Sequence, residues 1–140
     1  MLDKLFSGAT DVMAKAMDGL SLRQKAVAEN IANADTPHYK RFEVAFEGQL
    51  QRAVSQPGQF DVPMATSNSR HFRVDGPQSL DEFQALVSRS DESTMRNDGN
   101  NVDVDAEMTR LAQTSISYNA MADLMKRNME GLKSVIRGTP

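Results

Sequence analysis

The sequence predicts a mainly α-helical protein. Long N- and C-terminal helices are expected to pair as an antiparallel, coiled-coil-like hairpin, joined by an irregular, partly extended central segment. Apolar residues recur at heptad spacing in both terminal parts, whereas glycine and proline are frequent between them. The two periodic parts also have similar lengths, so they can pair along their whole extent. We therefore divide the 140 residues into an N-terminal helix over 1–36, a central segment over 37–101 and a C-terminal helix over 102–140.

The N-terminal helix is predicted from apolar residues that recur between Leu2 and Ala34. Pro37 disfavours helical geometry at the preceding residue, Thr36, so the helix is expected to end near Ala34. Further apolar residues flank this seam, and a face of that width needs more than one neighbouring helix. The seam consists of Phe6, Met13, Leu20, Val27 and Ala34, each seven residues after the one before.

Asp18 and Gly19 form the weak point of this helix. Glycine inside a helix costs about 1 kcal/mol relative to alanine, because its backbone loses more freedom on folding. Ser21 followed by Gln24 offers an alternative, a new helix that starts with a capping box. We predict one continuous helix, because the apolar seam passes this point without a change of period.

The C-terminal helix is predicted to begin after an N-cap at Asp103 and to stop at Gly138. Asp105 and Glu107 place acidic groups in its first turn, where they complement the helix dipole. Its apolar seam steps by four and three residues: Val104, Met108, Leu111, Ser115, Tyr118, Ala122, Met125, Met129, Leu132 and Ile136.

The central segment contains one strand signal. Phe42, Val44 and Phe46 alternate with charged or small residues, which predicts a short extended strand. From residue 48 to residue 101, glycine and proline are frequent and apolar residues are sparse. Such a segment has little apolar surface to bury, so most of it is expected to be loop.

A short helix is expected over residues 79–87 as an exception within this loop-like sequence. Ser79 and Glu82 have the spacing of a capping box, in which each side chain bonds to the other residue's backbone N–H. Phe83, Leu86 and Val87 follow at spacings that would place them on one side of a helix.

Composition and charge argue against several classes of function. The chain carries 16 lysines and arginines against 19 aspartates and glutamates, a formal net charge of −3. This balance does not favour nucleic acid as a partner. Cysteine is absent, which excludes disulfides and thiolate metal sites. A helix-turn-helix at residues 26–41 is an alternative, but the sequence after Pro37 offers few side chains for contact with bases.

The sequence lacks the patterns that are typical of catalysis, a cofactor site or a small-molecule substrate site. His38 and His71 lie more than thirty residues apart in loop-like sequence, which favours solvated residues over a catalytic or metal-binding pair. The acidic stretch around Gly99 does not fit a calcium loop, because its third position is Arg96 and its twelfth is Asp105. We expect no enzyme activity, no metal and no cofactor.

No apolar run in the sequence approaches the ~20 residues that a membrane helix needs. Near the start, Asp3 and Asp11 stand where a secretory signal has a long apolar core. No cleaved signal peptide is therefore expected, and a route out of the cytoplasm would have to work without one.

Two motifs point to a known family. One is N-I-A-N-A-D-T-P-H-Y-K (30–40), preceded by R-Q-K-A-V-A-E (23–29); the other is R-N-D-G-N-N-V-D-V-D-A-E-M (96–108), followed by Y-N-A (118–120). The first resembles the N-terminal signature of bacterial flagellar axial proteins, the rod, hook and hook-filament junction subunits. The second is similar to the motif that distinguishes proximal-rod subunits within that family. The resemblance covers both ends of the chain in the same order.

This resemblance implies a structural subunit of the flagellar basal-body rod, the drive shaft that passes torque across the periplasm for motility. It also implies export through the flagellar type III apparatus without cleavage. The implied partners are other copies of the chain, other rod subunits, FliE, and the inner-membrane ring and export apparatus at the base. His38 stands where the family commonly has glycine, so the turn after Pro37 is expected to form without glycine's positive φ.

We predict that two groups of residues make the contacts between subunits, through amide hydrogen bonds and apolar packing. Helices with wide apolar faces need several neighbours, which a helical array of heterologous contacts supplies. An isolated subunit should then have largely unfolded or loosely helical ends. A soluble coiled-coil adaptor or export chaperone is the alternative. The predicted interface residues are Asn30, Ile31, Asn33, Asp35, Thr36, Pro37, Tyr39, Lys40, Val104, Met108, Leu111, Tyr118, Met125, Met129, Leu132 and Ile136.

Overall fold

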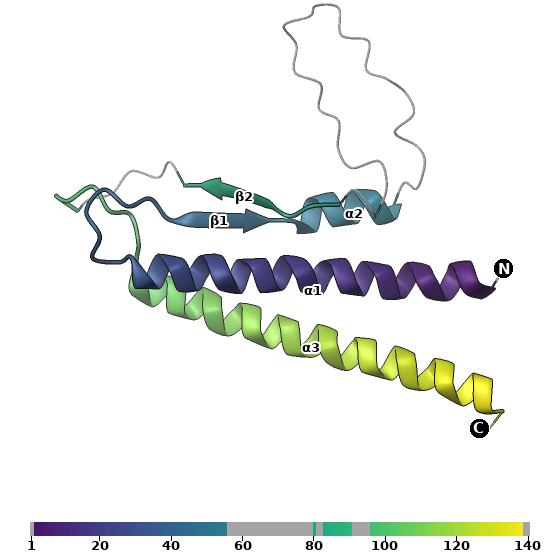
Figure 1. Ribbon diagram of the computed structural model, residues 1–140. Helices are drawn as coiled ribbons and strands as arrows, with labels where there is room; N and C mark the ends of the chain where they lie inside the picture. The colour runs from purple at the N-terminus through teal and green to yellow at the C-terminus, as the bar shows by residue number, and fades with distance from the viewer. Residues whose placement is uncertain (1, 56–79, 81–82, 91–95, 139–140) are drawn as a thin grey trace, which may run out of the picture.

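A computed structural model describes residues 2–55, 80, 83–90 and 96–138 of the chain (Figure 1). It confirms a mainly helical protein with long helices at both ends. Within the described part of the chain, a small two-stranded sheet and one short helix lie between them in the sequence. The elements are α1 (Leu2–Ala32), β1 (Phe42–Ala45), α2 (Glu47–Ser55), β2 (Leu86–Arg89) and α3 (Val104–Arg137).

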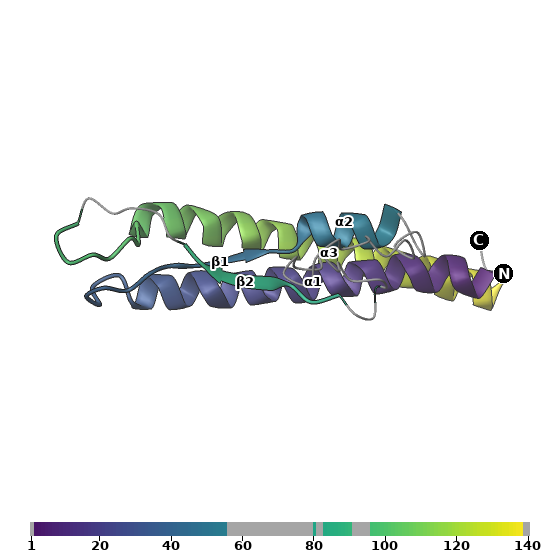
Figure 2. The same ribbon diagram turned by 90° about the horizontal axis from the view of Figure 1, so that it is seen from above.

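The helices α1 and α3 lie side by side where the C-terminal part of α1 meets the N-terminal part of α3 (Figures 1 and 2). Asn30 bonds to Glu107, and Gln24 bonds to Ser115, so the two helices run in opposite directions here. We call this the closed end of the molecule. The N-terminal part of α1 and the C-terminal part of α3 extend to the opposite end of the molecule, which we call the open end, and the two helices diverge toward it in Figure 1.

The arm, which we define as residues 42–55 and which contains β1, Phe46 and α2, lies along α1 and forms the core with it. The buried core residues are Leu20 and Ala26 of α1, Val44 and Phe46 of the arm, and Phe83. The predicted strand at Phe42–Phe46 is confirmed as β1, and β2 pairs with it in antiparallel register. The core therefore lies beneath the arm, and not along the whole length of the two long helices.

Helix α1 passes through Gly19 without interruption, which confirms the prediction of one helix and excludes a new start at Ser21. Gly19 is buried against the ring of Phe46. A Cβ atom at this position would lie only 2.6 Å from the Phe46 ring, far inside contact distance. Glycine is thus required here by the close approach of the arm, and its low helix propensity is offset by the burial of Phe46.

Replacing Gly19 with alanine should therefore destabilise the protein. Alanine would gain about 1 kcal/mol in helix propensity, but the added methyl overlaps the Phe46 ring, and overpacking of this kind costs about 1–3 kcal/mol. Urea unfolding followed by circular dichroism measures the balance. Gly8→Ala is the matched control, because a Cβ at Gly8 meets nothing within 4 Å; it should be neutral or stabilising. A more stable Gly19→Ala variant would contradict this packing.

Arg23 of α1 holds the arm in place. Its guanidinium lies 4.7 Å from the centroid of the Phe46 ring and donates to the carbonyl oxygen of Val44 at 2.8 Å. The same group pairs with the Glu47 carboxylate at 2.6 Å. Hydrogen bonding from Arg23 lowers the pKa of Glu47, although partial burial opposes this effect. Glu47 also stands in the first turn of α2, where a negative charge is favourable.

The expected helix over residues 79–87 is wrong in its described part. Residues 83–85 are not helical, and Leu86 and Val87 belong to strand β2. Val87 lies opposite Val44, and Leu86 lies opposite Ala45. Pairing with β1 and burial of Phe83 in the core favour the extended conformation. The predicted helix covers only residues 79–87, and its sequence pattern is too short to outweigh these tertiary contacts. Ser79 and Glu82 of the proposed capping box lie outside the described residues.

The expectation of loop after residue 48 is wrong for α2, which covers Glu47–Ser55. Gly48, one of the glycines that favoured a loop over residues 48–101, lies inside this helix. The signal was the spacing of Leu50 and Val54, four residues apart, which places both on one side of α2. Leu50 packs against the core, and this tertiary contact stabilises a helix that the local sequence favours only weakly.

Helix α3 has the predicted ends. Asp103 accepts hydrogen bonds from the backbone N–H groups of Asp105 and Ala106, and Gly138 has φ 65°. The face that it buries differs from the predicted seam, because Glu107 and Thr114 are its buried residues. The predicted members Val104, Met108, Met129 and Ile136 are 41%, 52%, 37% and 83% exposed, whereas Leu111, Tyr118, Met125 and Leu132 are half-buried. The side of α3 that is buried therefore contains two polar residues, Glu107 and Thr114, and only part of the predicted apolar seam.

Candidate functional site

The most deeply buried large side chains in the described residues are polar. Asn30 and Asn100 have no exposed surface, and Glu107 is 1% exposed. Together with Arg41, which is 5% exposed, they form what we call the polar cluster, at the closed end of the molecule. Buried polar groups are costly unless they are bonded, so such a cluster specifies one arrangement of the elements around it.

Asn30 joins three elements through its side-chain amide. Its Oδ1 atom accepts from the backbone N–H of Phe42 at 2.8 Å, and its Nδ2 atom donates to the carbonyl of the same residue at 2.9 Å. Nδ2 also donates to Glu107 of α3 at 3.0 Å, and the hydroxyl of Tyr39 donates to Oδ1 at 3.2 Å. Burial and the nearby Glu29 carboxylate raise the pKa of Tyr39 above its ordinary value.

Asn100 closes the C-terminal end of α1. Its Nδ2 atom lies within 3.0 Å of the carbonyl oxygens of Asn33, Ala34 and Thr36, in the turn that follows the last residue of the helix. Its Oδ1 atom accepts from the backbone N–H of Val102 at 2.7 Å. The segment before α3 is thereby bound to the end of α1.

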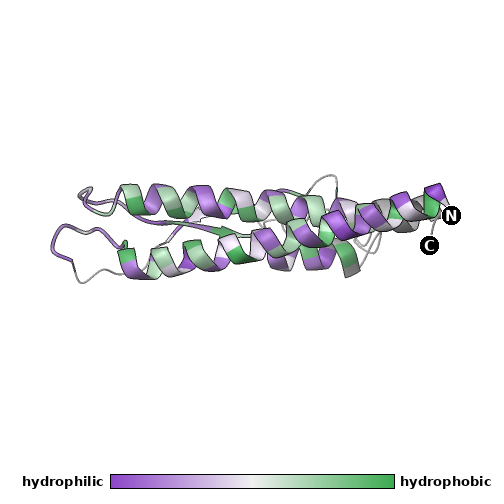
Figure 3. Ribbon diagram, turned by 90° about the horizontal axis from the view of Figure 1, so that it is seen from below, coloured by the Kyte–Doolittle hydropathy of each residue, from purple (hydrophilic) through white to green (hydrophobic). Residues whose placement is uncertain are grey.

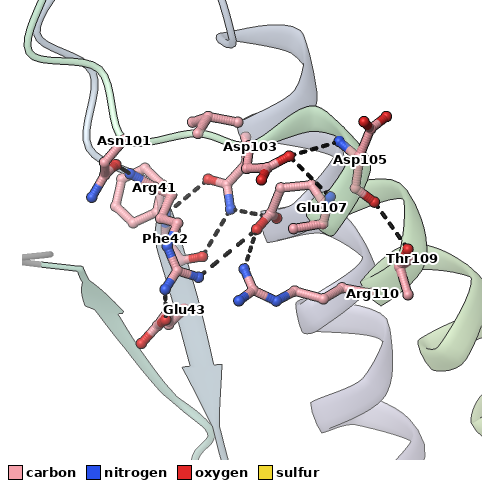
Figure 4. Close-up of polar contacts among 12 residues, drawn as sticks. Arg41, Phe42, Glu43, Asn101, Asp103, Asp105, Glu107, Thr109 and Arg110 are labelled. Carbon is pink, nitrogen blue, oxygen red and sulfur yellow. Dashed lines mark hydrogen bonds and ion pairs between the residues drawn. The ribbon is translucent and has the colours of Figure 1, made fainter. Parts of the chain in front are cut away.

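Glu107 is the buried charge of the cluster (Figure 4). It accepts a short hydrogen bond from Arg110, one turn further along α3, and its Oε1 atom lies 3.8 Å from the guanidinium of Arg41. Arg41 in turn pairs with Glu43 at 2.5 Å. A buried carboxylate requires such partners, because an unpaired charge in the interior is strongly destabilising.

The turn after Pro37 differs from the turn that was expected, because it contains a residue with positive φ. His38 has φ 61°, so it adopts the left-handed conformation that was expected to be unavailable without glycine. Its backbone N–H donates to the carbonyl of Asp98 at 2.9 Å, which fixes the turn against the segment before α3. There, the Asn100 backbone N–H and Arg96 lower the pKa of Asp98 by bonding to its carboxylate. His71 lies outside the described residues.

The two sequence motifs are thus brought together in space. The 30–40 motif supplies Asn30 and the end of α1, whereas the 96–108 motif supplies Asn100 and Glu107. The buried roles of Asn100 and Glu107 are not evident from the sequence, in which Glu107 has only the position of a first-turn acid. The signal that could have found them is the pair of asparagines before the N-cap, since asparagine satisfies helix ends at close range.

The predicted interface residues fall into different environments. Asn30 makes its four hydrogen bonds within the chain, and the amide of Asn33 donates to the Glu29 carbonyl of its own helix at 2.8 Å. Lys40, Ile31 and Tyr39 are half-buried. The members that are open to a neighbour in this part of the chain are Asp35, Thr36 and Pro37, all exposed.

The bonds of the polar cluster described above go to side chains and backbone groups of this chain. Within the described residues, the His, Asp and Glu side chains form no group of three or more that could hold a metal ion. No described helix combines the length and apolar character that crossing a bilayer requires.

Comparison with known proteins points to a structural role. A family model described as flagella basal body rod protein matches residues 11–40. The flagellar basal body rod protein FlgB of Bacillus subtilis is 37% identical over 134 residues, covering 96% of this chain and 97% of that protein. FlgB of Borrelia hermsii is 33% identical over 135 residues, covering 95% and 98% of the two chains. FlgB of Yersinia enterocolitica is 32% identical over 139 residues, covering 98% of both.

The chain belongs to the FlgB family of flagellar basal body rod proteins. It is therefore a structural subunit of the bacterial flagellar basal body and serves motility rather than catalysis. Membership also removes the support for the alternative of a soluble adaptor or chaperone, since relatives of nearly the same length are named as rod proteins. In this rod subunit, the polar cluster joins α1 to β1 and α3.

Proposed function

We propose that this subunit forms part of the proximal, periplasm-spanning region of the rod and helps to transmit torque. The observation that carries the proposal is the distribution of apolar surface. On α3, Ile116, Val135 and Ile136 are 70%, 76% and 83% exposed, and Leu124 is 51% exposed. Figure 3 shows apolar positions along both long helices, including the parts beyond the arm. Side chains of this kind require neighbours that an isolated subunit does not contain.

The division of the chain supports a two-part role in assembly. We propose that the helices of 1–36 and 102–140 form the rod core and pair as a coiled-coil-like hairpin over their full length once neighbours surround them. The central segment, 37–101, then braces the closed end through the arm. The polar cluster sets the register between α1 and α3, because Asn30 and Glu107 meet in one alignment of the two helices.

We propose that the exposed residues among the predicted interface residues make the contacts with neighbouring subunits. Asp35, Thr36 and Pro37 would contact a neighbour at the closed end, and Met108, Met129 and Ile136 would do so along α3. Methionine suits contacts with non-equivalent neighbours, because its unbranched side chain repacks easily. FliE and the inner-membrane ring are the proposed partners at the base of the rod. Export without a cleaved signal peptide is part of the same proposal.

Placing a charge on this surface tests the function. Ile136→Asp should prevent rod assembly and swimming while leaving the fold of the isolated subunit intact, because Ile136 is 83% exposed in the subunit and would be buried in the rod. Leu111→Asp and Leu132→Asp, at half-buried positions, should also prevent assembly. Asn119→Asp adds the same charge at an exposed polar position of α3 and serves as the control. Normal basal bodies in an Ile136→Asp strain, counted by electron microscopy, would contradict the proposal.

A further inference from the structure

The two strands of the sheet differ in what covers their outer edges. In an antiparallel pair, the backbone groups of successive residues alternate between facing the partner strand and facing away from it. Ser90 donates to the carbonyl of Arg41 at 2.9 Å, so these two residues face each other. The register places Phe42 opposite Arg89 and Val44 opposite Val87. It follows that the backbone groups of these four residues point away from the partner strand.

The outer edge of β1 is occupied by side chains of α1. Asn30 bonds to both the N–H and the carbonyl of Phe42, as a neighbouring strand would. The guanidinium of Arg23 bonds to the carbonyl of Val44. Three of the four outward backbone groups of β1 are therefore satisfied within the subunit, and a further strand cannot add at this edge.

No side chain of the described residues covers the outer edge of β2 in this way. The outward N–H and carbonyl groups of Val87 and Arg89 make no hydrogen bond to any other described residue. All four residues of β2 are exposed, and the apolar side chains of Leu86 and Val87 are 56% and 44% exposed. Soluble proteins commonly guard such an edge with an outward charge. Here the charged residue, Arg89, instead lies over the ring of Phe42, with its guanidinium carbon 5.2 Å from the ring centroid.

We infer that the outer edge of β2 is a docking site for an extended segment of a neighbouring rod subunit, which adds to the sheet as a third strand. The inference rests on the proposed function, because the rod supplies the neighbour. The four outward backbone groups of Val87 and Arg89 need hydrogen-bond partners. An extended segment supplies them, because its own N–H and carbonyl groups face the edge at alternate residues. Leu86 and Val87 favour apolar side chains on that segment.

A neighbour related by a heterologous contact fits this edge better than a symmetric pair of β2 strands. Pairing of β2 with β2 of a second copy would be isologous and would close the assembly at two subunits. A rod requires contacts that continue from subunit to subunit. The docking segment is therefore a different part of the neighbouring subunit, and each subunit presents its own β2 edge to the next.

Val87→Pro tests the inference in the full-length chain, expressed in place of the parent in motile cells. Proline removes the outward N–H of Val87, while the bonds between β1 and β2, made by the residues on either side, are kept; edge strands tolerate proline at such positions. The purified variant should keep the circular dichroism spectrum and melting behaviour of the parent. The number of basal bodies with assembled rods should fall at least tenfold. Val87→Ala, which keeps the N–H group, should assemble as the parent does.

Several outcomes would overturn the inference. One is a Val87→Pro variant that builds rods at the parental level, and another is a Val87→Ala variant that fails as completely as Val87→Pro. A third is a discrete dimer of the isolated parent that Val87→Pro abolishes, since it indicates pairing of two β2 strands. If Val87→Pro does not fold, hydrogen exchange decides: the amides of Val87 and Arg89 should exchange more slowly in purified basal bodies than in the isolated chain, and equal rates contradict docking. Absence of the parent chain from purified basal bodies would instead contradict the proposed function itself.

Discussion

Replacing Glu107 with alanine is expected to destabilise the isolated subunit by about 3–5 kcal/mol, because it removes one partner from a buried charge network. The side chain of Arg41 is only 6% exposed and would lose a buried partner, the Glu107 carboxylate 3.8 Å away, while keeping the carboxylate of Glu43, whose side chain is 47% exposed. The Nδ2 atom of Asn30 would lose its bond across to α3. A natural domain is stable by about 5–15 kcal/mol, so this loss would leave the closed end close to unfolding.

Urea unfolding of the purified chain, followed by circular dichroism, measures this effect. Glu107→Gln retains an oxygen that Asn30 can bond to but removes the charge, so its stability should lie between those of the parent and Glu107→Ala. Asp123→Ala is the control, since Asp123 is an exposed acid on the same helix and such surface changes stay within about 0.5 kcal/mol. If Glu107→Ala and Asp123→Ala unfold at the same urea concentration, the polar cluster does not stabilise the fold.

Replacing Asn100 with alanine should destabilise the closed end by at least about 2 kcal/mol, because carbonyl groups at the end of α1 lose their buried donor. The carbonyls of Asn33, Ala34 and Thr36 would be left without the Nδ2 atom that lies within 3.0 Å of each. The N–H of Val102 would also lose its acceptor. Since these groups join α1 to the segment before α3, the effect should reach both helices.

The location of the damage distinguishes this role from a general loss of stability. Hydrogen exchange in Asn100→Ala should accelerate first at the last turn of α1 and at residues 98–104, ahead of the core beneath the arm. Asn119→Ala, at an exposed position of α3, should leave exchange unchanged. Exchange that accelerates equally throughout the chain, or not at all, would contradict the proposed capping role of Asn100.

The sequence predicted the elements that depend on local chemistry. Heptad spacing predicted both long helices, and the caps at Asp103 and Gly138 follow from side-chain and glycine preferences at helix ends. The alternation of Phe42, Val44 and Phe46 predicted β1 for the same reason. Each of these signals lies within a few residues of the structure that it specifies.

The features that escaped prediction depend on contacts between distant parts of the chain. Strand β2 forms because Val87 pairs with Val44, more than forty residues earlier. The buried role of Glu107 depends on Arg41 and Asn30, which its neighbours in sequence do not reveal. The left-handed His38 is held by a bond to Asp98, sixty residues later. Local patterns contain no information about such partners.

Hydrogen exchange of the isolated subunit, compared with the subunit in purified basal bodies, tests the central claim most directly. In the isolated subunit, we expect slow exchange only at the closed end and beneath the arm, where buried side chains lie. Residues 8–15 of α1 and residues 122–137 of α3, among which no side chain is fully buried, should exchange fast in isolation and slowly in the rod. Slow exchange along the whole of both helices in the isolated subunit would contradict the claim that neighbouring subunits complete this fold.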